Sequence, residues 1–294
     1  INSANIGNGG VMYVMGGTIR NCLFDHVYAD IGGGAGIAMR MDGEGLVSNC
    51  VFRSCSATGP NVGDGGCAAL YVIKGTVADC RIYGNSVRGG CAGVYMGGGT
   101  MLNSLIYDNV ATNCYSQTDG GAGLRMADGT VRNCTITRNR TLYDPEGRGF
   151  SGVQMSKGTL TNCVVYGNIG GDLRKTGGKA VYCCFGQDVE GDGNLNADPR
   201  FANPAAKDFT LNATSPCVGA GGSGDDMGYQ QLTEAQKTAP AIGFSADKTF
   251  ACGASAEFTF TASGVNGAGT DYVWDFGDGS EAGAGVEVTH AYAP

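Results

Sequence analysis

The feature that most constrains this chain is a recurring segment of glycine followed by alternating apolar residues, as in GTIRNCLF and GTVRNCTI. Seven glycines begin copies of it: Gly17, Gly45, Gly75, Gly99, Gly129, Gly158 and Gly178. The successive spacings are 28, 30, 24, 30, 29 and 20 residues. Such uneven spacing excludes a helical solenoid of strict period. It favours a coil whose strands are fixed while its loops vary in length.

Apolar residues occupy matching places in every copy. Seven residues after the glycine lie Phe24, Phe52, Ile82, Ile106, Ile136, Val165 and Phe185. A further short strand before the glycine alternates apolar and polar residues, as in Leu70-Tyr71-Val72. Period two marks a strand with one buried face. About three such strands per turn can pair with the turns above and below, so we predict an all-β fold: a right-handed parallel β-helix of about seven or more coils.

At these residues the sequence resembles a known family. The pattern GG-x-A-G-Φ-x-M-x-x-G-T-Φ-x-N-C, where Φ is apolar, is similar to the pectate-lyase-like right-handed β-helix superfamily of secreted bacterial proteins. The resemblance covers roughly residues 9–230 and implies a β-helix over 1–235, with a C-terminal cap at about 186–235. The superfamily includes polysaccharide lyases, glycoside hydrolases, adhesins and surface proteins, so the resemblance implies the fold and leaves the activity open.

A second domain is expected over residues 236–294. Its segments Trp-Asp-Phe-Gly-Asp-Gly at 274–279 and Val-Thr-His-Ala-Tyr at 288–292 closely resemble the PKD-type, Ig-like β-sandwich. The resemblance implies an extracellular spacer or binding module. The family continues past His-x-Tyr into a last strand, whereas this chain stops at Pro294, so we expect a sandwich without that strand.

The composition limits the classes of partner that this protein can bind. Of 294 residues, 53 are glycine, 42% are hydrophobic and only 16% are charged, with a net charge of −8. The apolar share suffices for a core, and glycine suits a turn-rich β protein. A negative chain is poorly suited to nucleic acid, and no apolar run approaches a membrane-spanning length. We therefore expect no nucleic acid partner and no membrane insertion.

Cysteine and asparagine form columns of their own. Five residues after the repeat glycines stand Cys22, Cys50, Cys80, Ser104, Cys134, Cys163 and Cys183. In-register parallel neighbours lie about 4.8 Å apart, too far for a disulfide, so we predict packed thiols. We expect coil-corner residues at Asn21, Asn49, Asp79, Asn103, Asn133 and Asn162, and a second structural column at Asn85, Asn109, Asn139 and Asn168. The disulfide candidates are Cys67 with Cys91 and Cys184 with Cys217.

One run resembles part of a calcium loop. Residues 188–196 match its first nine positions, with Asp188, Asp192 and Asn194 as weak candidate ligands. Position twelve is Pro199 where such loops carry a bidentate Glu, and no helices are expected to flank the run. Calcium is thus the one cofactor left open, and the expectation is that none is bound.

Catalytic groups are harder to place. One outward column reads Tyr13, Tyr71, Tyr95, Arg125 and Gln154, and another reads Asp25, Arg53, Tyr83, Tyr107, Thr137 and Tyr166. No pair of acids is brought together in either column, which argues against an active site, although the loops 55–65, 110–121 and 140–150 remain as places for one. Aromatic faces along a ladder suit sugar rings, which makes Tyr13, Tyr71, Tyr95 and Arg125 the candidate carbohydrate-binding residues.

These observations predict a secreted or cell-surface protein that acts as a structural stalk, an adhesin or a glycan-contacting module, with no chemistry assigned. Its partner would be an extracellular polysaccharide or a cell-surface glycan. One alternative is a polysaccharide lyase or glycoside hydrolase. Another is a subunit of an extracellular filament, assembled head to tail through the two unfinished ends.

Overall fold

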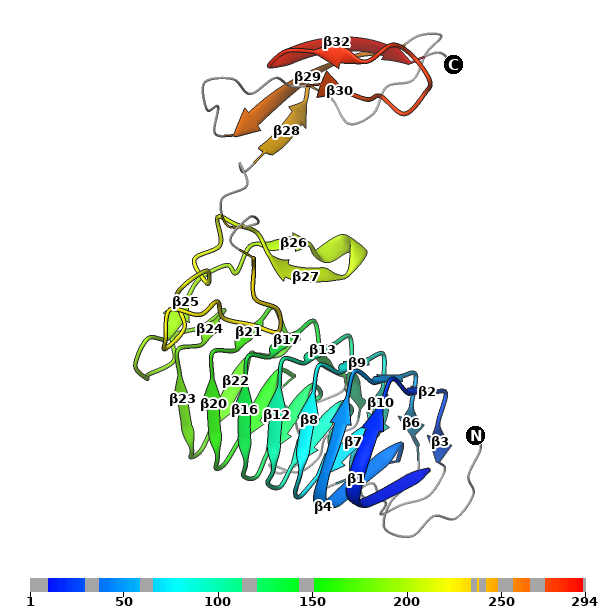
Figure 1. The fold of residues 1–294 in the computed structure, drawn as a ribbon, viewed down its shortest axis with the longest axis vertical. Helices are drawn as coiled ribbons and strands as arrows, with labels where there is room; N and C mark the ends of the chain where they lie inside the picture. Colours follow the sequence, from blue (N-terminus) through cyan, green and yellow to red (C-terminus); the bar gives the residue numbers. More distant parts are fainter. Residues whose placement is uncertain are drawn as a thin grey trace. The chain divides into compact units, whose positions relative to one another are not determined.

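The computed structural model describes residues 10–29, 37–58, 66–112, 121–142, 151–233, 237, 242–247, 256–264 and 273–292. The chain forms two compact units, Ile1–Leu232 and Thr233–Pro294. In the described part of the first unit the regular elements are strands and one short 3-10 helix, η1 (Pro204–Ala206). Figure 1 shows the strands of the first unit stacked along one axis.

The largest sheet has twelve strands and runs through the long strand β4 (Met39–Ser48), which belongs to two faces of the solenoid. The first face contains β1 (Met12–Arg20), β4, β7 (Leu70–Val72), β11 (Val94–Met96), β15 (Leu124–Met126), β19 (Val153–Met155) and β22 (Leu173–Lys175). The second face continues from β1 and β4 into β8 (Thr76–Ala78), β12 (Thr100–Leu102), β16 (Thr130–Arg132), β20 (Thr159–Thr161) and β23 (Lys179–Val181).

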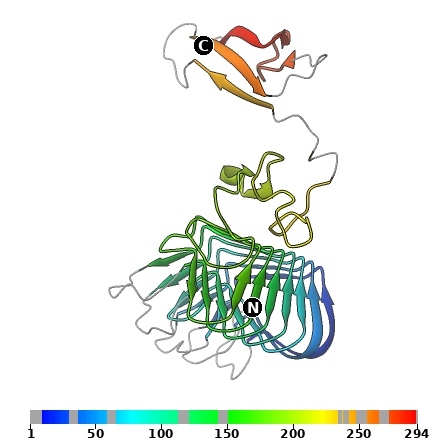
Figure 2. The same ribbon diagram turned by 90° about the vertical axis from the view of Figure 1, so that its left-hand side faces the viewer.

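Two more sheets complete the coils. The third sheet contains β2 (Leu23–Asp25), β5 (Val51–Arg53), β9 (Arg81–Tyr83), β13 (Leu105–Tyr107), β17 (Thr135–Thr137), β21 (Val164–Tyr166), β24 (Cys184–Phe185) and β25 (Leu195–Asn196). The fourth contains β3 (Tyr28–Ala29), β6 (Ser56–Ala57), β10 (Ser86–Arg88), β14 (Val110–Thr112) and β18 (Arg140–Leu142). Neighbouring strands in all these sheets pair in parallel, as Figure 2 also shows for successive coils. The predicted parallel β-helix is confirmed, with a fourth short strand in several coils that the sequence pattern did not reveal.

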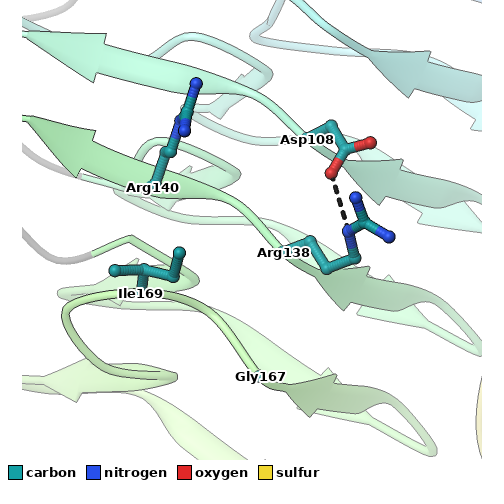
Figure 3. Close-up of a pocket in the computed structure, with 5 residues that line it drawn as sticks. All are labelled: Asp108, Arg138, Arg140, Gly167 and Ile169. Atoms are coloured by element: carbon teal, nitrogen blue, oxygen red, sulfur yellow. Dashed lines mark hydrogen bonds and ion pairs between the residues drawn. The ribbon is translucent and has the colours of Figure 1, made fainter. Parts of the chain in front are cut away.

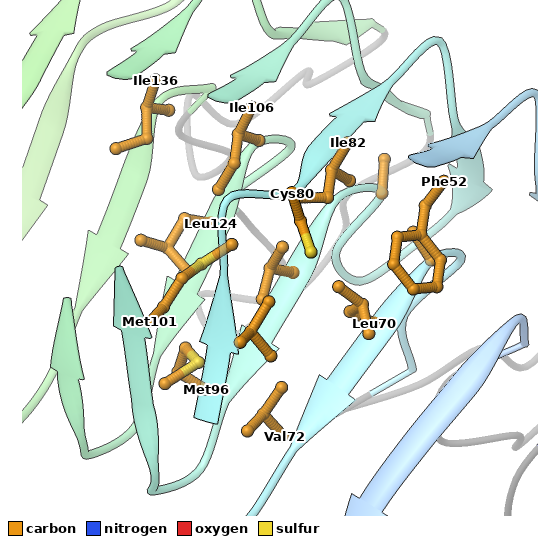
Figure 4. Close-up of a cluster of buried hydrophobic side chains, with 14 of the residues drawn as sticks. Phe52, Leu70, Val72, Cys80, Ile82, Met96, Met101, Ile106, Leu124 and Ile136 are labelled. Atoms are coloured by element: carbon orange, nitrogen blue, oxygen red, sulfur yellow. The ribbon is translucent and has the colours of Figure 1, made fainter. Parts of the chain in front are cut away.

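The core is the dry interior of these coils (Figure 4). The column seven residues after the repeat glycines is buried from Phe24, which is 7% exposed, to Phe185, which is fully enclosed. Identical or similar side chains stack coil on coil, and the rings of Phe24 and Phe52 lie 4.6 Å apart and nearly parallel. Each buried aliphatic side chain contributes about 1.5–3 kcal/mol, which is how very short strands become stable.

The asparagine columns have the structural roles predicted for them. The backbone is left-handed at the corner positions, with φ of 56° at Asn21 and 46° at Asn103. The second column is a buried ladder, in which the amide oxygen of Asn139 accepts hydrogen bonds from the backbone N–H and side-chain amide of Asn109. The last amide, that of Asn168, donates to the carboxylate of Asp172. The ladder therefore satisfies buried polar groups in every coil that it crosses.

The cysteine column is a row of packed thiols, as predicted. The Cys163 thiol donates to the carbonyl of Thr161, two residues before it, and its sulfur accepts from the backbone N–H of Cys134. Ser104 takes a thiol's place in the row and donates to Leu102 in the same manner. Since each thiol has its own carbonyl partner, the column is held without cross-links.

Two amide side chains close the C-terminal end of the coils. Gln187 accepts from the backbone N–H groups of Asp172 and Leu173 and donates to the Leu173 carbonyl. Asn194 accepts from the Cys183 N–H and donates to the Ala180 carbonyl. These side chains supply the hydrogen bonds that another strand would make, so the described ends of β22 and β23 are not left open.

The predicted cap does more than end the solenoid. Its hairpin of β26 (Phe201–Asn203) and β27 (Asp208–Leu211), with η1 between them, folds back along the outer side of the third sheet, and the segment to Leu232 follows it. Tyr107 and Thr137 point outward from the coil, as predicted, but neither reaches solvent. Both are buried, at 6% and 2% exposure, because Phe209 and its neighbours cover them.

The second unit is a small antiparallel arrangement. One sheet has the order β28 (Ile242–Ala246), β29 (Ala256–Gly264), β32 (Glu287–Tyr292), and β30 (Val273–Trp274) pairs with β31 (Gly283–Ala284). Phe260 lies 5.9 Å from both Trp274 and Phe276, and the Phe276 ring stacks on His290. Trp274, from the segment that resembles a PKD domain, thus belongs to the aromatic cluster of this unit.

Candidate functional site

The outward residues of the first face stand in register, one per coil, as the sequence predicted. The ladder consists of Tyr13, Arg40, Tyr71, Tyr95, Arg125, Gln154 and Arg174. Arg40 completes it between Tyr13 and Tyr71. We call this set the tyrosine–arginine ladder.

The ring faces of this ladder are already occupied. Tyr71 and Tyr95 stack with centroids 4.4 Å apart. The guanidinium of Arg40 lies 5.0 Å above Tyr71, and that of Arg125 lies 5.5 Å from the Tyr95 ring. A sugar ring would have to displace an arginine to stack on either face, which makes Tyr71 and Tyr95 less suited to a glycan than the sequence alone suggested. The ladder instead stabilises the sheet through cross-strand pairs.

The first tyrosine of the ladder is also engaged. The hydroxyl of Tyr13 donates to the carboxylate of Asp42 over 2.7 Å, and this raises the Tyr13 pKa. The Arg40 guanidinium donates to the same carboxylate and lowers the pKa of Asp42. The phenol, carboxylate and guanidinium thus form one charge-assisted network at the turn between the first and second faces.

A different site forms where the cap meets the third sheet. Arg138, which follows β17, donates from Nε to Asp108 over 2.9 Å and from Nη1 to the Pro204 carbonyl of the cap over 3.0 Å. Lys207, at the tip of the cap hairpin, pairs with the other oxygen of Asp108 at 3.3 Å. These three side chains clamp the hairpin to the coils. Sequence reasoning missed them because nothing in the repeat places the cap beside β13 and β17.

Two adjoining hollows lie along this seam and share Arg138 and Gly167. One has a volume of about 330 Å³ and is lined also by Asp108, Arg140 and Ile169, as Figure 3 shows. The other, of about 320 Å³, is lined by Thr137, Arg138, Tyr166, Gly167, Asp198, Arg200, Phe201, Pro204 and Phe209. We call the two hollows together the cap groove.

The cap groove combines an apolar lining with cations. Tyr166, Phe201 and Phe209 supply aromatic surface, and burial raises the pKa of Tyr166 above its ordinary value. Arg140 is exposed at the rim, and its guanidinium has no hydrogen-bond or ion-pair partner among the described residues. A concave surface with aromatic rings and a few polar groups is the usual form of a ligand site.

Two of the calcium candidates, Asp188 and Asn194, line one hollow of about 430 Å³ together with Glu190 and Asn196. The amide oxygen of Asn194 accepts from the Cys183 backbone, and its amide nitrogen donates to Ala180 and Val189, so Asn194 is a capping residue rather than a ligand. Asp188 accepts from Asn196. Asp192 contributes its backbone carbonyl to Tyr182. Within the described ranges no three His, Cys, Asp or Glu side chains gather as a metal site.

The disulfide candidates are adjacent pairs of buried thiols. Cys67 and Cys91 are direct parallel partners, and their thiols donate to the carbonyls of Gly93 and Val94. Cys184 and Cys217 meet where β24 contacts the cap, and each is fully buried.

The loops proposed as alternative places for catalytic groups lie largely at 59–65, 113–120 and 143–150, outside the described residues. Among the residues that are described, no helix has the length and apolar character needed to cross a membrane.

Comparison with known families agrees with this architecture. A family model described as right-handed beta helix region matches residues 2–185, and one described as PKD domain matches residues 237–294. No curated protein and no solved structure matches the chain. The combination of these two domains is typical of extracellular proteins.

Proposed function

The chain belongs to the right-handed β-helix family and carries a PKD domain at 237–294, and on that premise we propose that it is a secreted or cell-surface stalk protein that contacts an extracellular polysaccharide through its cap groove. In this role the coils provide a stiff support and the groove provides the contact. The protein performs no chemistry on the bound chain.

The cap groove is the observation that carries this proposal. A sugar ring offers apolar C–H faces and a rim of hydroxyl groups, and aromatic surface beside planar cations is complementary to both. The groove has Tyr166 and Phe201 on its apolar side and Arg140 at its open rim. The coils hold the groove rigidly, because Thr137, which also lines it, donates to the Tyr166 carbonyl of the next coil over 2.7 Å.

Affinity electrophoresis tests the proposal. The full chain is run through gels that contain acidic polysaccharides (polygalacturonate, alginate) or neutral ones (xylan, β-glucan). We expect retardation by at least one polysaccharide, and a loss of about tenfold in affinity for Arg140→Ala, since a charge-assisted contact is worth about 1.5 kcal/mol. Arg88→Ala is the matched control: Arg88 is also exposed and lies in β10 of the same sheet as Arg140, but does not line the groove.

The same samples distinguish binding from catalysis. The products are analysed for new reducing ends and for unsaturated ends, with and without calcium. Bound polysaccharide that remains intact supports the stalk role. If the protein produces new reducing or unsaturated ends and a groove variant does not, the stalk role is rejected in favour of a lyase or hydrolase function.

Head-to-tail assembly is a second candidate, favoured by the first coil. Tyr13, Met15, Leu23 and Tyr28 are all exposed large side chains of that coil, at 39–63% exposure. Among the described strands, β1, β2 and β3 each pair on one side only. Exposed apolar side chains on an edge strand are a surface for association.

Light scattering over a hundredfold concentration range tests assembly. Head-to-tail assembly predicts a mass that increases with concentration. Leu23→Lys should prevent this increase, whereas Leu142→Lys, at an exposed site on β18, should leave it unchanged. A monomer at every concentration would rule it out.

A further inference from the structure

The described cysteines differ in how their neighbouring cysteines are placed. Eight of the eleven described cysteines stand in the main column of successive parallel coils or, like Cys67 and Cys91, directly opposite each other across a parallel bridge, while Cys55 stands next to Asn85 in the asparagine ladder. Neighbours of this kind are separated by the coil spacing of about 4.8 Å, which is longer than the Cβ separation that a disulfide prefers. Each thiol in the main column also donates to a carbonyl two residues earlier, as Cys80 does to Ala78.

Cys184 and Cys217 belong to neither arrangement. Cys184 points outward from β24, and Cys217 comes from the cap segment that follows β27. The two side chains approach from separate layers and are fully buried, and the Cys184 thiol donates to the Ala197 carbonyl over 3.2 Å. Val164, Leu211 and Met227 enclose them in one apolar cluster. Their approach is not restricted by the spacing of the coils, so a disulfide needs no change of strand register.

We propose that Cys184 and Cys217 form a disulfide that fastens the cap to the last coil. This inference rests on the proposed function, because secreted and cell-surface proteins meet the oxidising conditions in which such a bond persists. The bond forms by exchange with an oxidised dithiol or small-molecule disulfide. The two thiols lose two protons and two electrons, a sulfur–sulfur bond forms between them, and the disulfide of the oxidant is reduced to two thiols.

The position of this bond relates it to the cap groove. The loop that it closes, residues 184–217, contains β25, β26, η1 and β27, and thus Phe201, Pro204 and Phe209 of the groove wall. Closing a loop of this length restricts the unfolded chain and stabilises the native cap. The clamp of Arg138, Asp108 and Lys207 holds the tip of the same loop. The disulfide therefore fixes the base of the groove wall while the clamp fixes its tip.

Peptide mapping of the full chain, exported to an oxidising compartment, tests the bond. Free thiols are alkylated under denaturing conditions and the chain is cleaved with trypsin without reduction. We expect a linked pair of peptides, 180–200 with 208–237, that disappears on reduction and in Cys217→Ser. Because 180–200 also contains Cys183, the pair must survive Cys183→Ala and be lost in Cys184→Ala. Peptides 54–74, with Cys55 and Cys67, and 89–125, with Cys91 and Cys114, serve as the internal control and are expected unlinked; any link between them is assigned to Cys67 and Cys91 only if Cys67→Ala removes it.

Other results would overturn the inference. Alkylated Cys184 and Cys217 in a chain that binds polysaccharide would reject the disulfide and retain the proposed function. A linked peptide in a chain that binds no polysaccharide would support the disulfide and reject the proposed function. A link between Cys67 and Cys91 would contradict the geometric argument that singles out the cap pair. The linked protein should also show a higher midpoint of thermal unfolding than Cys217→Ser, by several degrees.

Discussion

The outer sides of the first face and of the third sheet both carry a column of tyrosines, but different groups cover the two columns. Each carries tyrosines stacked at the coil spacing, with ring centroids 4.4 Å apart for Tyr71 and Tyr95 and 4.8 Å for Tyr83 and Tyr107. On the first face, arginines from adjacent coils cover the ends of the stack. On the third sheet, the cap covers it with Phe209 and leaves a groove beside it.

The difference teaches that a column of aromatic residues does not by itself identify a binding surface. What matters is which groups lie against the ring faces. Within the repeat the neighbours are fixed by the register, so a column flanked by arginines makes its own contacts. A concave site forms only where a non-repetitive segment returns to the coils. The cap is such a segment, and the predictions below test whether the two faces differ as described.

The largest expected effect is on the capped face. Phe209→Ala removes a ring that is 1% exposed and packed on Tyr107, which should cost about 3–5 kcal/mol of cap stability. Native-state hydrogen exchange of β27 amides measures this locally. The matched change on the other face, Tyr95→Ala, removes a half-buried ring and should leave β27 exchange unchanged. Equal effects of the two variants on β27 would show that the cap does not depend on this contact.

The second prediction concerns alkaline pH. Burial under the cap raises the pKa of Tyr107 to about 12, whereas an unfolded tyrosine titrates near 10. The folded state therefore favours the neutral phenol. Its contribution to stability is complete below pH 10 and is lost as the pH rises from about 10 to 12. The pKa values of Tyr13, Tyr71, Tyr166 and Tyr229 are also raised, so the absorbance of tyrosinate should show several late-titrating groups. Tyr107→Phe should remove one of them and reduce the alkaline loss of the cap. A normal titration of Tyr107 would contradict its burial.

The smallest stability effect is expected in the tyrosine–arginine ladder. Tyr71→Leu keeps apolar bulk on the sheet but removes a stacked pair and the contact with Arg40, so it should cost about 1 kcal/mol. Chemical denaturation of the first unit measures it. Arg40→Met, which keeps the length of the side chain, tests whether the guanidinium carries this energy. A cost of several kcal/mol for either variant would mean that the ladder supports more of the fold than its half-buried position indicates.

Much of the fold could be predicted because each coil places similar residues at the same positions. The buried columns, the left-handed corner at Asn21 and its equivalents, and the thiol row follow from residues that occupy the same place in every copy. The fourth sheet was missed because its strands are only two or three residues long and sit next to loops of variable length.

The candidate site could not be predicted in the same manner. Arg138, Lys207 and Phe209 are unremarkable in the sequence, and they meet only because the cap turns back along β13 and β17. The tyrosine–arginine ladder was located correctly, but its occupied ring faces depend on side-chain conformations that spacing does not specify. The role of Asn194 was also hidden, since an asparagine that caps a strand end and one that binds calcium look alike in a sequence.

The most direct test is the affinity of the full chain for a polysaccharide-derived oligosaccharide, measured by calorimetry for Tyr166→Ala and Tyr71→Leu. Tyr166 lines the cap groove, whereas Tyr71 is enclosed in the ladder. We predict a loss of about tenfold for Tyr166→Ala, the equivalent of about 1.4 kcal/mol, and no change for Tyr71→Leu. The reverse result, with binding lost in Tyr71→Leu and kept in Tyr166→Ala, would contradict the assignment of the groove.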